Sequence, residues 1–174
     1  WSSDVCSSDL TSTINITAVN DAPVVTPGTT LAYTENGSAA AINSALTLTD
    51  ADDTEIASAT VSITSPVTGD VLAFTNQNGI TGSYNSGTGV MTLSGTTTVA
   101  NYQTALRSIT YASTSDDPTS NNTRASRTIT WSVTDANSDS VGAATGTATS
   151  TINITAVNDA PTSTDDSEIG RAHV

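Results

Sequence analysis

The residues best suited to chemistry in this chain are short runs of oxygen-bearing side chains. Asp50-Ala51-Asp52-Asp53 places three carboxylates within four positions, and the pair Asn20-Asp21 recurs unchanged as Asn158-Asp159. Carboxylate and amide oxygens are the ligands that Ca²⁺ takes in proteins, about 6–8 of them at ~2.3–2.6 Å. The chemistry indicated is the holding of a hard cation.

The chain also contains a perfect internal repeat. The segment TSTINITAVNDAP occupies Thr11–Pro23 and again Thr149–Pro161, 138 positions later. An identical segment at this spacing indicates a piece of a tandem array. We expect residues 11–23 to be the last strand and linker of one repeat, residues 24–161 to be a complete repeat, and residues 162–167 to begin the next linker.

The two ends of the chain share an origin outside the repeat. The sequence EIGRAHV at 168–174 can be encoded by a DNA segment whose reverse complement encodes DVCSSDL at 4–10. We interpret residues 1–10 and 168–174 as tails translated from a sequencing adapter and exclude them from the functional argument. The exclusion removes Trp1, the lone Cys6 and the lone His173.

Composition argues against several functional classes. The chain has 17 Asp and Glu against 4 Lys and Arg, all four of them Arg, and a formal net charge of −13. This charge disfavours nucleic acid and anionic membranes as partners, and no run approaches the ~20 apolar residues of a membrane span. Once the tails are excluded, the sequence offers no His, Cys or Lys as base or nucleophile, so we expect a non-enzymatic protein.

Alternation of apolar and polar residues predicts an all-β fold, a Greek-key β-sandwich. The helical spacing of Val99, Tyr102 and Leu106 interrupts this alternation and predicts one short helix near 98–106. Gly, Asn, Asp and Pro clusters separate the strands. We expect strands near 25–34, 39–49, 56–64, 71–75, 79–84, 89–93, 107–113, 127–135 and 144–157.

The strand order sorts the acidic residues into two groups, one at each end of the domain. The N-terminal pole, beside the linker at residues 20–21, is expected to hold Asp21, Asp50, Asp52, Asp53, Asp135 and Asp139. The C-terminal pole is expected to hold Glu35, Asp116, Asp117 and Asp159, with Arg124 and Arg127 nearby. Close carboxylates repel by about a few kcal/mol per pair at an effective dielectric near 20, and a bound cation removes that cost. The alternative is solvated loop charge, screened by salt.

Taken together, these motifs resemble cadherin-like repeats. The linker Val19–Pro23 is similar to the N-D-N-A-P linker of cadherins, and Glu35-Asn36 to their E-N pair after the first strand. Asp50-Ala51-Asp52 resembles the D-x-D motif, and Asp135 the aspartate of A-x-D. The D-R-E motif is not present. The closer resemblance, over most of residues 11–161, is to cadherin-like and immunoglobulin-like tandem repeats of large bacterial surface or secreted adhesins with V-N-D-A-P linkers.

The resemblance implies an extracellular structural repeat that extends an adhesin from the bacterial surface, with Ca²⁺ rigidifying the linkers between neighbouring repeats. The implied metal ligands are Asn20, Asp21, Glu35, Asp50, Asp52, Asp135, Asn158 and Asp159. An unknown cell-surface or matrix ligand is left open as a further partner. The alternative function is a calcium-dependent module that binds glycans or proteins. Trp131 is the candidate aromatic platform for that function, although its place between Ile129 and Val133 favours the core.

Overall fold

The computed structural model describes residues 12–138 and 140–160. The expectations for the tails at 1–10 and 168–174, for the next linker at 162–167 and for Asp139 lie outside the described residues. The elements of the described part are β1 (Val24–Thr26), β2 (Leu31–Thr34), β3 (Ala40–Ala41), β4 (Thr47–Thr49), β5 (Glu55–Thr64), β6 (Asp70–Ala73), β7 (Thr81–Asn85), β8 (Val90–Thr98), α1 (Val99–Ser108), β9 (Thr110–Ser113), β10 (Ser126–Asp135) and β11 (Thr145–Thr155).

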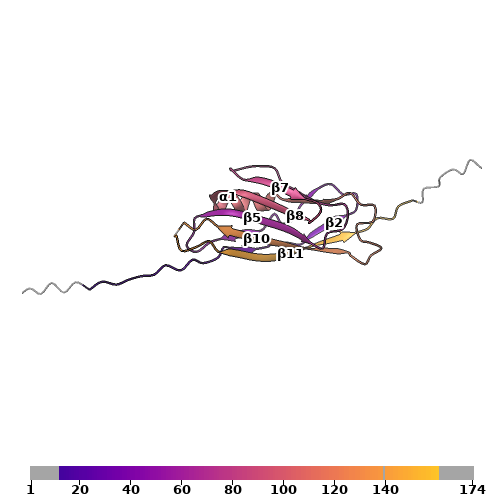
Figure 1. Cartoon of the computed structure of the whole chain (residues 1–174). Helices are drawn as coiled ribbons and strands as arrows, with labels where there is room; N and C mark the ends of the chain where they lie inside the picture. Colours follow the sequence, from indigo (N-terminus) through magenta and orange to yellow (C-terminus); the bar gives the residue numbers. More distant parts are fainter. Residues whose placement is uncertain (1–11, 139, 161–174) are drawn as a thin grey trace, which may run out of the picture.

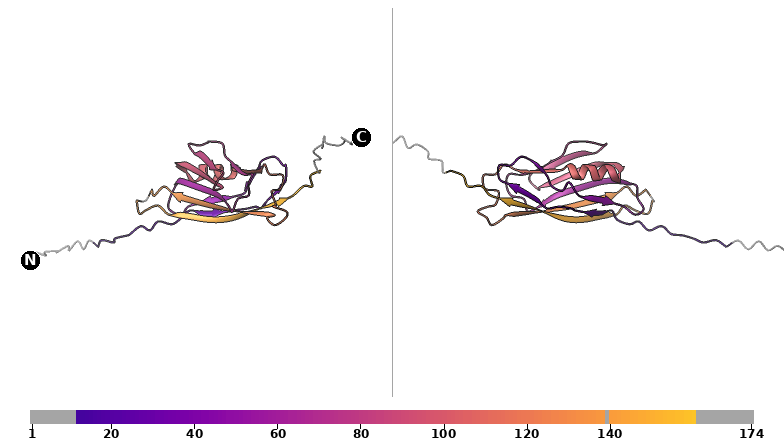
Figure 2. Two further views of the ribbon diagram at one scale, coloured as in Figure 1. Left: turned by 45° about the vertical axis from the view of Figure 1, so that its right-hand side comes forward. Right: turned by 180° about the vertical axis from the view of Figure 1, so that it is seen from behind.

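These strands form the predicted all-β sandwich. One layer is a six-stranded sheet in the order β2-β11-β10-β5-β8-β7, in which β2 and β11 are parallel and the other neighbours antiparallel. The short sheets β3-β9-β6 and β1-β4, together with α1, cover one face of it (Figures 1 and 2). The domain is elongated, and the extension before β1 and the residues after β11 leave it at opposite ends (Figure 1).

The apolar face of β10 forms the centre of the core. Ile129, Trp131 and Val133 are all fully buried, as their alternation predicts. The indole Nε1 of Trp131 donates a hydrogen bond to Ser150 Oγ on β11 at 2.8 Å, which satisfies its one polar atom. Trp131 is therefore a core residue and offers no exposed platform for a ligand.

The single strands predicted at 25–34 and 39–49 are wrong, because each segment divides between two sheets. The first becomes β1, paired with β4, and β2, paired with β11. The buried side chain of Asn43 holds the crossing point: its Oδ1 accepts from Gly28 N and its Nδ2 donates to Thr29 O. A Cβ at Gly28 would lie 2.7 Å from Ala45 O, so the two crossings pack too closely for a side chain.

The predicted helix is confirmed as α1. Thr98 caps its first turn, since Thr98 Oγ1 accepts from Asn101 N. Tyr102, Ala105 and Leu106 form its buried face. The Tyr102 hydroxyl donates to Gly95 O, so α1 is tied to the strand that precedes it.

A buried ion pair joins the small sheet to the large one near the C-terminal pole. Arg127 Nε donates to Asp70 Oδ2 at 2.6 Å, and both side chains are fully buried. The Tyr111 hydroxyl donates to Asp70 Oδ1 at 2.6 Å, and Arg127 also donates to the carbonyls of Pro118 and Arg124. Arg127 thus fixes the loop between β9 and β10.

Replacing Arg127 with Met should destabilise the domain by about 3–5 kcal/mol, because Asp70 would remain buried without its counter-charge. Urea unfolding followed by far-ultraviolet circular dichroism measures the change. Arg124→Met is the matched control: the Arg124 side chain donates one exposed bond, to Ser65 O, and its loss should cost no more than about 1 kcal/mol. Equal stability losses in the two variants would contradict this role for the ion pair.

The buried tyrosines should make the domain sensitive to alkali. Burial raises the pKa of Tyr102 to about 12, and burial with the bond to Asp70 raises the pKa of Tyr111 further. Because both folded-state pKa values lie above the ordinary value of 10.0, their contribution to stability is complete below pH 10 and is lost as the pH rises through the folded values. The phenolate absorbance of Tyr102 and Tyr111 should therefore appear together with unfolding as the pH is raised. Ionisation of all tyrosines near pH 10 in the native state would refute this prediction.

Candidate metal centre

The turn after β4 gathers three carboxylates. Asp50 Oδ1 accepts from the backbone N of Asp53 at 2.9 Å and of Asp52 at 3.3 Å, which bends the chain back on itself. One carboxylate oxygen of each of Asp50, Asp52 and Asp53 then lies within 4.8 Å of the others. Burial raises the pKa of Asp50, and the charge of Asp52 adds to the rise.

Asp135 brings a fourth carboxylate to this pole from the end of β10. The pairing of β10 with β5 shifts register between Thr134 and Asp135, an irregularity that commonly re-aims a side chain. Asp135 is fully buried, and its Oδ2 accepts from Ala144 N at 2.9 Å and from Asn20 Nδ2 at 3.0 Å. The same Asn20 amide donates to Gly142 O at 2.6 Å, so Asp135 connects the linker to the loop after β10.

The linker is seated against the domain along residues 20–23. Asp21 N donates to Asp52 Oδ2 at 3.0 Å. Pro23 is buried beside Gly146 of β11, where a Cβ would lie 1.6 Å from Pro23 O. Gly146 therefore allows the linker backbone to lie directly on β11.

Three buried oxygens at this pole have no hydrogen-bond partner: Asn20 Oδ1, Asp50 Oδ2 and Asp53 Oδ2. Buried polar atoms in proteins are nearly always paired, so each of these needs an explanation. Asp53 is only 4 % exposed, and its Oδ1 already accepts hydrogen bonds from the backbone N and the hydroxyl of Ser138. A cation would supply the missing partner, and the all-oxygen donor set fits Ca²⁺ rather than a metal that prefers nitrogen or sulfur.

Five of the sequence-predicted ligands lie at this pole, namely Asn20, Asp21, Asp50, Asp52 and Asp135. Only Asp50 and Asp52 belong to the carboxylate triplet, while Asp135 is bound to Asn20. Asp21 is exposed and is held through its backbone. The sequence predicts Asp53 at this pole but not as a ligand, yet Asp53 is the buried member of the triplet while Asp52 is exposed. The sequence pattern does not distinguish the two neighbours, since only the turn geometry decides which one points inward.

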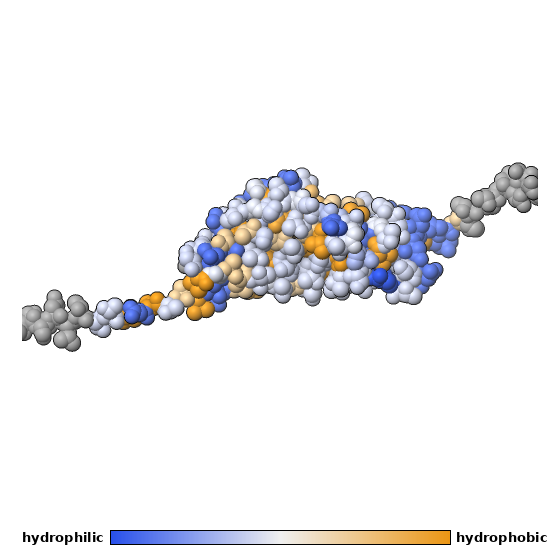
Figure 3. Space-filling view, in the orientation of Figure 1, coloured by the Kyte–Doolittle hydropathy of each residue, from blue (hydrophilic) through white to orange (hydrophobic). Residues whose placement is uncertain are grey.

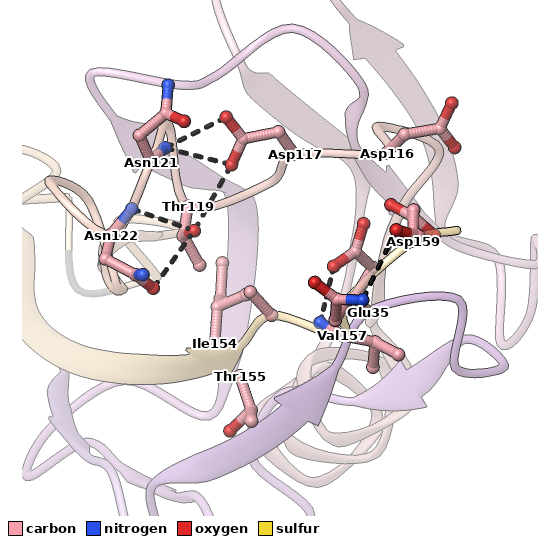
Figure 4. A pocket seen from close by; sticks show the side chains of 12 residues that line it. Glu35, Asp116, Asp117, Thr119, Asn121, Asn122, Ile154, Thr155, Val157 and Asp159 are labelled. Carbon is pink, nitrogen blue, oxygen red and sulfur yellow. Dashed lines mark hydrogen bonds between the residues drawn. The ribbon is translucent and has the colours of Figure 1, made fainter. Parts of the chain in front are cut away.

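The other three predicted ligands, Glu35, Asn158 and Asp159, lie at the C-terminal pole. Glu35 is only 3 % exposed: its Oε2 accepts from Val157 N at 2.7 Å, and its Oε1 is buried without a partner. It lines an open cleft of about 590 Å³ with Asp116 and Asp159 (Figure 4). Within one repeat, the eight predicted ligands therefore form two separate groups.

The two arginines near the C-terminal pole do not neutralise its acids. Arg127 is buried against Asp70, and Arg124 donates to Ser65 O. Asp117 instead receives the backbone N of Asn121 on both carboxylate oxygens, at 2.9 and 3.0 Å. In the described residues, Arg127 with Asp70 is the one salt bridge, so the carboxylates of both poles stand without basic partners.

Comparison with known proteins gives a limited match. No family model and no solved structure matches this chain. Halomucin of Haloquadratum walsbyi is 35 % identical over 113 residues, which cover 61 % of this chain and 1 % of that protein. The match therefore covers about one hundredth of the relative's length, and it shows neither a cadherin-like nor an immunoglobulin-like type of repeat. Within the described residues, helix α1 is too short to cross a membrane.

Asp50→Asn should raise the melting temperature of the metal-free domain at neutral pH. The variant keeps the Oδ1 acceptor that forms the turn and removes a charge that burial disfavours. Thermal unfolding in chelator compares it with Glu55→Gln, a nearby exposed carboxylate outside the triplet, which should leave the melting temperature unchanged. A lower melting temperature for Asp50→Asn would mean that its carboxylate stabilises the metal-free fold.

Proposed function

We propose that this chain carries one non-enzymatic repeat of an extracellular tandem array, a spacer whose junctions are stiffened by calcium. The internal repeat supports the array, and the opposite exits of the chain suit a spacer (Figure 2). The match to halomucin, whose name denotes a mucin-like protein, supports an extracellular setting. The calcium proposal rests on the unpartnered buried oxygens of Asn20, Asp50 and Asp53 at the N-terminal pole.

The linker appears twice in this chain, and each copy displays one half of a junction. At the C-terminal pole, Val157 N is bound by Glu35 of the repeat that has just ended. At the N-terminal pole, the equivalent linker binds the repeat that follows, through the Asn20 side chain on Asp135 and the Asp21 backbone on Asp52. In an array, both halves act on the same linker.

Combining the halves brings the acids of two repeats together. The contacts fall on three consecutive positions, valine, asparagine and aspartate, which span no more than ~10 Å even when fully extended. Glu35 of one repeat must then lie near Asp52 and Asp135 of the next, since these two residues bind the same linker. Because a span of ~10 Å is comparable with the Debye length of ~8 Å at physiological ionic strength, salt screens the repulsion between these carboxylates only partly.

A bound calcium ion resolves this repulsion and limits bending. The N-terminal pole offers oxygens from Asn20, Asp50 and Asp53, and the preceding repeat adds Glu35 Oε1. An ion that takes ligands from both repeats couples their orientations, since bending at the linker would break metal–oxygen contacts. Mg²⁺ suits the junction less well, because it requires a smaller octahedral shell and retains its water.

The glycan-binding and enzymatic alternatives have weaker support. Trp131 is buried, so it cannot serve as the exposed aromatic platform that a lectin-like site needs. The clustered carboxylates lie in a turn and accept backbone hydrogen bonds, an arrangement that suits cation binding better than proton transfer. A spacer needs only the fold and the junction.

A chain of two repeats should melt higher and behave as a straighter particle in millimolar calcium than in chelator. Binding to the native state alone stabilises by about 2.7 kcal/mol at a hundredfold excess of ligand over Kd. Asp50→Asn in the second repeat should abolish both responses, because it converts a charged oxygen pair into an amide. Calorimetry and small-angle X-ray scattering measure the two effects, with Glu55→Gln as the control that retains them.

Three results would count against the proposal. Calorimetry that detects no calcium binding to the two-repeat chain at millimolar concentration would leave the acids as solvated charge. Full retention of the melting shift in Asp50→Asn would place any bound ion elsewhere. A melting shift without straightening would support binding within one repeat and contradict stiffening of the junction.

A further inference from the structure

We propose that Asn36 is the acceptor of an N-linked glycan, attached at the turn that follows β2. In the transfer, Nδ2 of Asn36 bonds to the anomeric carbon of an oligosaccharide carried on a lipid pyrophosphate. The bond between that carbon and the phosphate oxygen breaks, the lipid pyrophosphate leaves with the electron pair, and one amide proton passes to a base of the transferase. The inference rests on the extracellular setting proposed above and does not depend on calcium.

The first observation is a sequence pattern. N-glycosylation requires an asparagine followed, two residues later, by Ser or Thr, with any residue except proline between them. Four asparagines of the chain meet this requirement: Asn15, Asn36, Asn121 and Asn153. In a chain so rich in Thr and Ser the pattern also arises by chance, so it selects candidates only. Because Asn15 repeats Asn153 in the segment before the complete repeat, three distinct candidates remain.

The second observation is how the fold uses its asparagine side chains. Within residues 12–138 and 140–160, eight of the nine asparagines outside the pattern have a hydrogen-bonded side chain: Asn20, Asn43, Asn76, Asn85, Asn101, Asn122, Asn137 and Asn158. The four asparagines inside the pattern are all exposed, and none of their side chains is hydrogen-bonded to another described residue. The pattern therefore coincides with amides that the fold leaves available.

The surroundings of the three candidates separate them. Since the pattern requires a hydroxyl two residues after the asparagine, the transferase must reach both groups. After Asn121 that hydroxyl is engaged, because Thr123 Oγ1 donates to Ser120 O at 2.6 Å. Asn153 lies within β11, paired with β10 on one side and with β2 on the other, so its backbone is held in the sheet.

Asn36 meets both requirements. It lies in the turn after β2 with a φ of 61°, a left-handed conformation that Asn adopts more readily than most residues, and Ser38 is exposed with it. Within the described part of the chain, neither the Asn36 amide nor the Ser38 hydroxyl is hydrogen-bonded. Other groups hold the turn: Gly37 N donates to Thr34 O at 2.9 Å, and the Tyr33 hydroxyl donates to Gly37 O at 2.8 Å. A glycan can therefore be added without breaking a contact of the fold.

The position places the glycan beside the exit linker. Asn36 follows Glu35, which binds Val157 N, and β2 ends at the pole where the chain leaves the domain (Figure 1). The surface at that end is strongly hydrophilic (Figure 3), so a carbohydrate there extends into water without covering an apolar patch. Asn36 is not among the predicted metal ligands, so the modification leaves those side chains unchanged.

The test presents the folded full chain to a detergent-solubilised oligosaccharyltransferase with an oligosaccharide on a lipid pyrophosphate. The chain carries Asn15→Gln, because Asn15 lies outside the complete repeat. Mass spectrometry of the intact chain and of its peptides detects and locates the glycan. We expect it on Asn36, with little or none on Asn121 and Asn153.

The chain offers matched controls. Asn36→Gln and Ser38→Ala should each abolish the glycan and leave the melting temperature unchanged, since neither side chain is hydrogen-bonded within the described residues. Asn78 is an internal control: it is also an exposed asparagine before glycine, with a φ of 53°, but Ile80 stands where the hydroxyl is required. Asn78 should therefore stay unmodified.

The proposal is overturned if Asn36 of the folded chain stays unmodified while the same transferase modifies a reference acceptor peptide. Equal occupancy of Asn36 and either Asn121 or Asn153 would also overturn it, as would a glycan that persists in Ser38→Ala or appears on Asn78. Calcium binding is measured on the unglycosylated two-repeat chain, so a failure of glycan transfer is distinct from a failure of calcium stiffening.

Discussion

The placement of β11 between β2 and β10 is the constraint on which the rest of the structure depends. Its antiparallel pairing with β10 brings Ser150 to Trp131 and closes the core, and its parallel pairing with β2 carries the chain to Glu35. Because β11 spans the whole length of the domain, its two ends mark the two poles. Gly146 near its start supports the upstream linker, and Val157 beyond its end begins the downstream one.

That arrangement explains why the acids lie where they do. Hydrogen bonds from backbone amides hold Asp50, Asp135 and Glu35 in place, so these side chains shape turns and linkers in the absence of any ion. In Asp50 and Glu35 the backbone amides bind only one of the two carboxylate oxygens, and the other oxygen has no hydrogen-bond partner. The fold thus positions the oxygen ligands before any ion binds, so a cation would only have to fill a prepared arrangement, which would lower the ordering cost of binding.

The sequence predicted the features that depend on periodicity and strand order. The buried row around Trp131, the helix at α1 and the placement of Asn20 beside Asp135 all follow from alternation and chain direction. It did not predict features that depend on three-dimensional contact. The crossing at Asn43 and the ion pair of Asp70 with Arg127 join residues with no local pattern in common, 57 positions apart in the second case.

These contacts give a physical explanation for the strict identity of the repeated segment. Its first residues must fit a slot between two strands, where Ile152 and Ile154 are buried. Its last residues must fit the pole of the next domain, where the asparagine side chain and the aspartate backbone are bound. The valine that joins the two parts is itself held by Glu35. A segment that contacts two domains is constrained by both, whereas a loop such as residues 114–124 is constrained by one domain only.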